Sequence, residues 1–279
     1  MSDYVRDDST RSSELPSYRG IMAVDVANFS SGPSAKLPDL AAVIPDILEQ
    51  AFCRCDLAGV WKSRRFPQPT GDGYVFGTQP ENVPFLIHPL LDRLQDVLEE
   101  QDHVLRARDR GLRLRLRASI HIGPVHDRGD ARRDRIGTPT NDTFRLLDST
   151  PVKDVLRQSN PDVTLLAAIV SQRVYEDVIR AGYAGLHPDR FAPVTADVPG
   201  KGFAQPGWLY VPRPSRGGEA APRERDERGA APSARQAPRA GSNTISGEVG
   251  QAIMAERIDG NITFHDGHFG RSRHREVPE

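Results

Sequence analysis

The chain has 279 residues, with 37 Lys and Arg against 38 Asp and Glu, so its formal net charge is −1. This balance disfavours a nucleic-acid-binding protein, which is usually basic, and the length predicts one or two domains. Hydrophobic residues make up 37%, aromatic residues 6%, and there are 24 Gly and 23 Pro, so part of the chain is expected to be unstructured. No apolar run approaches the roughly 18 residues of a membrane helix, and the polar opening segment does not resemble a secretion signal. We therefore expect a cytoplasmic protein with neither a membrane nor a nucleic-acid partner.

The first half of the folded region is predicted to alternate strands with helices. Residues 1–17 show no apolar periodicity and are expected to be disordered. From residue 18 onward, apolar runs and helical spacing predict a buried strand at 20–25, a helix at 38–56 kinked by Pro45, short strands at 60–61 and 74–76 around the turn 71–73, and a long helix at 83–105.

The second half opens with strict alternation of two residue types. Leucines at 112, 114 and 116 alternate with arginines at 113, 115 and 117, which predicts a strand with one buried face and one solvated arginine face. The remaining expected elements are a continuation of this strand at 120–123, helices at 138–148 and 151–158, a strand at 163–169, a helix at 171–181 and a last strand at 208–211. Alternating strands and helices over residues 18–212 predict a single domain.

The chain beyond residue 212 differs in composition. Residues 213–241 contain no Val, Ile, Leu, Met, Phe, Tyr or Trp, so we expect a disordered linker. Apolar residues return at 242–270, in a segment that is short for a domain but patterned. The polar residues 271–279 are expected to form a disordered tail.

Two aspartates stand where strands are expected to end or turn. Asp25 closes the first buried strand, and Asp72 lies in the turn Gly71-Asp72-Gly73. A carboxylate in such surroundings costs free energy unless it is paired or bound to a cation, and two together suit Mg²⁺. Alternatively, Asp25 caps a helix and Asp72 is an ordinary turn residue.

Asn141 and Arg145 are four residues apart, so they share a helix face, and together they suit an anionic transition state.

In this order, several segments resemble the class III nucleotide cyclase family, the cyclase homology domain. The matching segments are 23–30 with Asp25, 70–73 with Asp72, 116–125, the run from Asp134 through Gly137 and Asn141 to Arg145, and 200–202 with Lys201. The residues Arg145-Leu-Leu-Asp148, Ile169-Val-Ser171, Arg173-Val-Tyr175 and Trp208 are similar to an actinobacterial branch of the family.

The resemblance implies an α+β fold: a ferredoxin-like βαββαβ-type cyclase homology domain with a mainly antiparallel sheet and flanking helices. It also implies a reaction in which a nucleoside triphosphate becomes a 3′,5′-cyclic nucleotide and pyrophosphate. By the same resemblance, Asp25 and Asp72 hold two Mg²⁺ or Mn²⁺ ions. Asn141 orients the ribose, Arg145 stabilises charge on the α-phosphate, and Lys201 binds the leaving phosphates. The family's sites lie between two subunits, so a homodimer is implied.

The base-binding positions depart from the family's purine cyclases. Gln68 stands where those enzymes have Lys or Glu, and a Gln amide both donates and accepts hydrogen bonds. Asp134 at the second base position could accept from an exocyclic amine. Purine and pyrimidine substrates therefore both stay open. So does a catalytically silent domain that senses a nucleotide and acts as an adaptor.

The segment 243–269 resembles the short amyloid-forming signalling motifs of bacterial and fungal defence proteins, which are distantly like the mammalian RIP homotypic interaction motif. Ile258, Ile262 and Phe264 have high β-propensity, and Gly247, Gly260 and Gly267 suit turns. This resemblance implies a partner that carries a similar motif, and a role in signalling or antiphage defence. A β-hairpin docked on the domain, or a segment without function, is the alternative.

Overall fold

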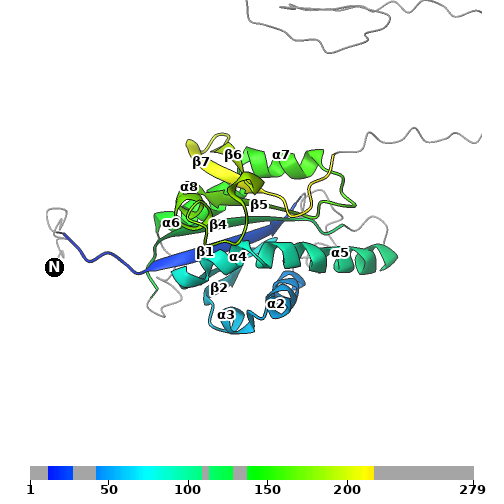
Figure 1. Ribbon diagram of the computed structural model, residues 1–279, viewed down its shortest axis with the longest axis horizontal. Helices are drawn as coiled ribbons and strands as arrows, with labels where there is room; N and C mark the ends of the chain where they lie inside the picture. The colour runs from blue at the N-terminus through cyan, green and yellow to red at the C-terminus, as the bar shows by residue number, and fades with distance from the viewer. Residues whose placement is uncertain (1–11, 28–41, 109–112, 128–136, 217–279) are drawn as a thin grey trace, which may run out of the picture. The chain divides into compact units, whose positions relative to one another are not determined.

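The computed structural model describes residues 12–27, 42–108, 113–127 and 137–216 (Figure 1). These residues belong to the first of two compact units, Met1–Arg223. The sequence predictions for 1–11, for Phe29 and Ser30, for Asp134 and for 217–279 lie outside the described residues. Within the described ranges, no helix combines the length and the apolar character needed to cross a membrane.

Four neighbouring strands form one side of the sheet. β1 (Tyr18–Val26) lies between β3 (Gly73–Thr78) and β4 (Leu116–Pro124), and β2 (Arg65–Pro69) pairs with the outer side of β3. All three pairings are antiparallel. The spatial order β2-β3-β1-β4 and the helices between β1 and β2 and between β3 and β4 are those of a ferredoxin-like βαββαβ unit. The expected α+β class is therefore confirmed.

Three more strands extend the sheet to seven. β5 (Leu166–Ser171) pairs parallel with β4, and β7 (Phe203–Tyr210) pairs antiparallel with β5 and with the edge strand β6 (Ala192–Val198). β6 was not predicted from the sequence. Only Ala196 and Val198 of this strand are buried, because it lies at the sheet edge, so it lacks the apolar run that marked the central strands.

Helices cover both faces of the sheet (Figure 1). The first face packs against α2 (Ile44–Arg54), α4 (Val83–Ile87) and α5 (Leu90–Arg108), in a core that includes Met22, Val24 and Val26 of β1. The opposite face carries α6 (Thr138–Leu147) and α7 (Thr150–Gln158), which pack on Ile21, Ala23 and Ile169. The remaining short elements are α3 (Ala58–Lys62), η3 (Pro80–Asn82), α8 (Gln172–Val174), the π-helical turn η4 (Tyr175–Ile179) and η5 (Pro188–Arg190).

Several predicted elements differ from the structure. Val60 and Trp61, predicted as a strand, lie in α3, where the Trp61 ring packs 5.2 Å from the Phe52 ring, and the strand that pairs with β3 is Arg65–Pro69. A two-residue apolar run cannot distinguish a strand from a helix. Pro45 falls in the first turn of α2, where proline is tolerated, so the predicted kink was wrong.

The two long helices predicted after β3 and β5 are interrupted. The helix expected at 83–105 is divided into α4 and α5 around the cis His88–Pro89 peptide. The helix expected at 171–181 consists of α8 followed by the π-helical turn η4. Apolar residues at helical spacing predict a helix, but they do not predict where a helix is interrupted.

The predicted solvated face of arginines was wrong for Arg115 and Arg117, whereas Arg113 is partly exposed and pairs with Asp162. Arg115 is buried and donates to the backbone oxygens of Leu156, at 2.7 Å, and Thr164, at 2.9 Å. Arg117 is also largely buried, with 11% of its side chain exposed. Helices α6 and α7 cover this face of the sheet, so the arginines are paired within the domain rather than hydrated.

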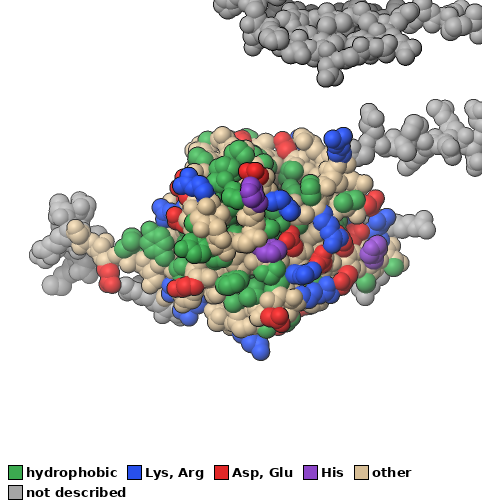
Figure 2. Space-filling view, viewed as in Figure 1, with side chains coloured by type: hydrophobic (Ala, Val, Ile, Leu, Met, Phe, Trp, Pro, Cys, Tyr) green, Lys and Arg blue, Asp and Glu red, His purple; other side chains and the backbone are tan. Residues whose placement is uncertain are grey.

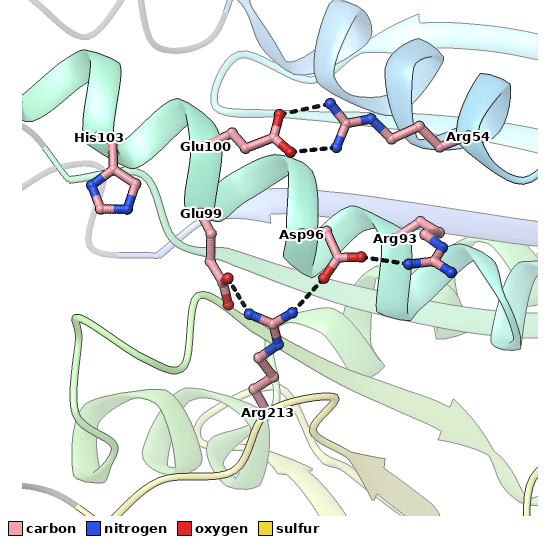
Figure 3. A pocket seen from close by; sticks show the side chains of 7 residues that line it. All are labelled: Arg54, Arg93, Asp96, Glu99, Glu100, His103 and Arg213. Carbon is pink, nitrogen blue, oxygen red and sulfur yellow. Dashed lines mark hydrogen bonds and ion pairs between the residues drawn. The ribbon is translucent and has the colours of Figure 1, made fainter.

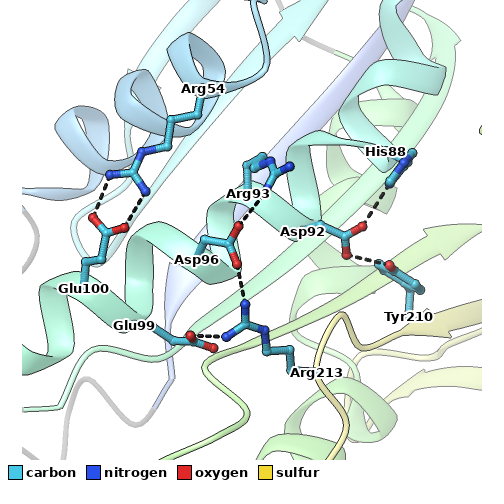
Figure 4. Close-up of polar contacts among 9 residues, drawn as sticks. All are labelled: Arg54, His88, Asp92, Arg93, Asp96, Glu99, Glu100, Tyr210 and Arg213. Atoms are coloured by element: carbon cyan, nitrogen blue, oxygen red, sulfur yellow. Dashed lines mark hydrogen bonds and ion pairs between the residues drawn. The ribbon is translucent and has the colours of Figure 1, made fainter.

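Ion pairs hold the chain that follows β7 against α5. Figure 2 shows positive and negative side chains interleaved over this helix. Figures 3 and 4 show Arg213 between Asp96, at 2.6 Å, and Glu99, and Arg54 paired in a two-pronged manner with Glu100. Exposed pairs of this kind contribute little stability individually. The described arginines and acids that line this hollow are matched with one another, so none of them offers an unpaired charge to a ligand.

Candidate active site

The fold brings Asp25 and Asp72 together. Asp25 lies at the end of β1 opposite Gly73 of β3, and Asp72 lies in the turn that leads into β3. The backbone N–H of Val26 donates to the backbone oxygen of Asp72 at 2.9 Å. In a ferredoxin-like sheet the end of β1 meets the β2–β3 turn, so two carboxylates far apart in sequence become neighbours.

Gly73 and Gly71 allow this close approach. A Cβ atom on Gly73 would lie 2.1 Å from the backbone oxygen of Val24 and 3.1 Å from the Cα of Asp25. Gly71 has a φ of +91°, which side chains rarely adopt. The Gly-Asp-Gly pattern in the sequence therefore has a steric cause: the hairpin turn lies directly against the end of β1.

The Asp25 carboxylate is paired with Arg117 of β4. The Arg117 Nε donates to Oδ1 at 2.8 Å and Nη2 donates to Oδ2 at 2.6 Å, and only 14% of the Asp25 side chain is exposed. Burial raises the pKa of Asp25 to about 7 despite this pairing, and the nearby charges of Asp72 and Asp148 add to the rise. The negative charge of Asp25 is thus only partly compensated.

This pair of carboxylates fits a divalent metal ion. Carboxylate oxygens are the ligands that Mg²⁺ and Mn²⁺ prefer, and an under-compensated buried carboxylate is stabilised by a cation. Among the residues described, no group of three or more His, Cys, Asp or Glu side chains is placed to hold a metal by itself. An ion at Asp25 and Asp72 would therefore complete its coordination with water, backbone oxygen or substrate.

Asn141 and Arg145 lie on the exposed side of α6. Both are solvent-exposed, and the Arg145 guanidinium lies over the Phe203 ring, 5.5 Å from its centre. Within the described ranges, neither residue forms a hydrogen bond or ion pair with Asp25 or Asp72. The shared helix face predicted from their spacing is confirmed, but both side chains are left available at the surface of a single chain.

Lys201 lies in the turn between β6 and β7, between two glycines with positive φ. Its Nζ is 3.0 Å from Oδ2 of Asp148, at the end of α6, and Lys153 pairs with the other oxygen of this carboxylate. Burial works against ionisation of Asp148, but both lysines outweigh it and hold its pKa below the usual range. Lys201 is exposed, so this pairing leaves it accessible.

Of the two expected base-contacting residues, Gln68 and Asp134, the structure describes only Gln68. Gln68 is exposed on β2, opposite Val75 of β3. Asp134 lies outside the described residues.

Arg117 and Asp148 are site residues that the sequence analysis missed. Arg117 appeared only as one arginine in an alternating stripe. Its pairing with Asp25 follows from the β1–β4 register, in which these two residues are direct partners. Asp148 affects the site through the charge it adds near Asp25. Neither relationship has a local sequence signal.

No protein-family model matches the chain, and no curated protein matches it. Among solved structures, a bacterial light-regulated adenylyl cyclase is 14% identical, with a TM-score of 0.49 over 74% of this chain. This chain spans 55% of that protein's length. Adenylate cyclases from Trypanosoma brucei are 16% identical, with a TM-score of 0.47, 71% of this chain and 91% of theirs being covered. The guanylyl cyclase Cya2 is 18% identical, with a TM-score of 0.43, over 70% of this chain and 91% of that one. These values describe a likeness of fold and leave the activity to be argued from the site.

Proposed function

We propose that the chain is a metal-dependent nucleotidyl cyclase, which converts a nucleoside triphosphate to a 3′,5′-cyclic nucleotide and pyrophosphate. The observation that carries the proposal is the meeting of Asp25 and Asp72 at the end of β1. The sequence resemblance to class III cyclases places metal-binding aspartates at these two positions, and the raised pKa of Asp25 is that of a carboxylate short of positive charge.

Asp25 and Asp72 would hold two Mg²⁺ or Mn²⁺ ions, which lower the pKa of a bound hydroxyl and offset phosphate charge. The ribose 3′-oxygen attacks the α-phosphorus, its proton leaves to solvent, and the bond to the pyrophosphate oxygen breaks. Asn141 orients the ribose, Arg145 stabilises charge on the α-phosphate, and Lys201 neutralises the departing phosphates.

Arg117 fits this scheme as the residue that protects the metal site of the free protein. Both oxygens of Asp25 accept from its guanidinium. A metal ion bound at Asp25 would share these carboxylate oxygens with Arg117 or displace its hydrogen bonds. The ion pair therefore limits the cost of the buried carboxylate until a cation arrives.

The active unit is proposed to be a homodimer with shared sites. Asn141 and Arg145 are exposed and make no contact with Asp25 or Asp72 of their own chain within the described residues. Exposed groups of this kind are free to complete the metal site of a second copy, as the family resemblance implies. Gln68 and Asp134 are proposed to contact the nucleobase.

The test pairs turnover with metal binding. Wild type, Asp25→Asn and Asp72→Asn are incubated with each nucleoside triphosphate, and Mn²⁺ binding is followed by electron paramagnetic resonance. Both variants should lose turnover and bind Mn²⁺ more weakly. The matched control is Asp154→Asn, an aspartate on α7 paired with Arg157, and it should behave as wild type. Full turnover in Asp72→Asn would reject the two-metal site.

The second candidate is a catalytically silent nucleotide sensor that recruits a partner. The pairing of both Asp25 oxygens with Arg117 favours it, because a metal site that never opens would look the same. Here residues 243–269, which lie outside the described residues, would contact a protein with a similar motif in a signalling or defence role. A peptide of 243–269 should then form thioflavin-positive fibres, and a peptide with Ile262→Asp and Phe264→Asp should not. A wild-type peptide that stays monomeric would exclude homotypic assembly.

A further inference from the structure

A second cavity, of about 690 Å³, lies away from the metal aspartates. It is an open cavity, lined by the C-terminal part of β4, the first turns of α6, the segment 171–177 and the first half of β7. Asp25 pairs with Arg117 near the start of β4, whereas the cavity is lined by His121 and Pro124 near the end of that strand. The volume is that of a small-molecule pocket.

Two buried polar atoms of the cavity have no hydrogen-bond partner. In the part of the chain that the structure describes, four buried side-chain atoms are in this position, and two of them, Oδ1 of Asp142 and Nδ1 of His121, belong to residues that line the cavity. Asp142 is 8% exposed. The nearest cation to its Oδ1 is Arg145 Nη1 at 3.7 Å, beyond hydrogen-bond distance.

Unpartnered buried atoms of this kind are rare because each costs about 1–3 kcal/mol. Burial raises the pKa of Asp142, although Arg145 opposes this rise. Burial and the charge of Arg173 lower the pKa of His121 to about 4, so its imidazole is neutral at pH 7. A neutral imidazole can offer Nδ1 as a donor or an acceptor. The cavity is thus lined by the Asp142 carboxylate, which lacks a hydrogen-bond donor, and by His121, whose Nδ1 can donate or accept.

The charge of the cavity indicates which ligand suits it. Among the described lining residues, Asp142, Glu176 and Asp177 carry negative charge and Arg173 alone carries positive charge. Glu176 accepts a hydrogen bond from Gln172 at 2.6 Å and Asp177 is exposed to solvent, so Asp142 is the least satisfied of the acids. The described acids and histidine do not form a group of three or more metal ligands, and the negative charge among them suits an organic cation.

We propose that this cavity binds a small organic cation, whose N–H group donates to Oδ1 of Asp142 while a second polar atom meets Nδ1 of His121. The ligand class is an amidine or amine. Asp142 directly follows Asn141 on α6, so an occupant contacts the helix that carries two of the proposed catalytic residues. The site itself does not depend on the cyclase proposal, because no metal ligand takes part in it.

Three probes of one shape test the proposal: benzamidine, which is cationic, benzamide, which is neutral, and benzoate, which is anionic. Binding to the full chain is measured by ligand-observed nuclear magnetic resonance in the presence of EDTA. Benzamidine should bind saturably and at least about tenfold more tightly than the other two. Asp142→Asn should weaken it roughly 10- to 100-fold, since one charged hydrogen bond is lost. Asp154→Asn on α7 is the matched control and should leave binding unchanged.

A second variant covers the case in which Asp142→Asn fails to fold. His121→Phe keeps a ring in place and should also weaken benzamidine, with a thermal unfolding transition recorded for each variant. Asp25→Asn should keep wild-type affinity, which separates this site from the metal site. No saturable benzamidine binding, equal binding of all three probes, or unchanged affinity in folded Asp142→Asn or His121→Phe would overturn the proposal.

Discussion

Replacing Asp25 by Asn should make the metal-free protein gain stability relative to wild type as the pH rises. The pKa of Asp25 is raised to about 7, chiefly by burial, from its ordinary value of 3.8. A raised pKa means that the folded state binds the proton more tightly than the unfolded state. The stability that this proton supplies is therefore complete below pH 3.8 and is lost as the pH rises through 7. Asn has the same shape as the protonated acid and cannot ionise.

The size of the effect follows from the shift. A rise from 3.8 to about 7 corresponds to about 4 kcal/mol in total, at about 1.4 kcal/mol per pKa unit. About 3 kcal/mol of this is lost between pH 5 and pH 8. Asn keeps only part of the pairing with Arg117, so the free energy of unfolding of Asp25→Asn differs from that of wild type by a constant amount as well. Because that amount does not vary with pH, the change in the difference between the two proteins isolates Asp25.

The assay is urea unfolding of both proteins from pH 5 to pH 8 in EDTA. The free energy of unfolding of Asp25→Asn, relative to wild type, should increase by about 3 kcal/mol across this range. Adding Mg²⁺ at pH 8 should stabilise wild type more than the variant, because only wild type has an ionised carboxylate at position 25. A difference that is the same at pH 5 and pH 8 would refute the raised pKa and the physical basis of the metal site.

Three further predictions test other parts of the molecule. Asp25→Asn and Arg145→Ala should each be inactive, but after subunit exchange their mixture should regain about one quarter of wild-type turnover, because half of the dimers then contain one intact site; no recovery would contradict shared sites. The lowered pKa of His121 supplies stability above pH 6.5 that is lost as the pH falls towards 4. In urea unfolding, wild type should therefore lose about 2 kcal/mol more stability than His121→Gln between pH 7 and pH 5. Parallel pH curves for the two proteins would contradict this. Gly73→Ala should cost about 1–3 kcal/mol in the same assay, because its Cβ meets the Val24 backbone oxygen, whereas a Cβ on Gly59 meets nothing and Gly59→Ala should not destabilise the protein; equal effects would contradict the packing argument.

The sequence predicted the central part of the fold because its signals are local. The apolar run at 20–25 and the Gly-Asp-Gly turn each report their own structure, and together they placed Asp25 and Asp72 at the end of a strand and in a hairpin turn. That the two side chains are neighbours came from the family resemblance. The structure gives the reason, which is the antiparallel pairing of β1 with β3.

What the sequence could not predict depends on contacts between distant residues. The pairing of Arg117 with Asp25 spans 92 positions and requires the β1–β4 register. Burial of Arg115 depends on carbonyl oxygens of Leu156 and Thr164, which no strand pattern reports. β6 is an edge strand and has little apolar surface to bury, so its residues resemble a loop.

Identification of the reaction product tests the central claim most directly. The full chain is incubated with all four nucleoside triphosphates and Mn²⁺, and the products are identified by mass spectrometry beside those of Asp72→Asn. The account predicts that wild type forms a 3′,5′-cyclic nucleotide and pyrophosphate from at least one of the four, and that Asp72→Asn forms neither. Wild-type protein that binds a triphosphate and Mn²⁺ but forms no cyclic product, or a variant as active as wild type, would contradict it.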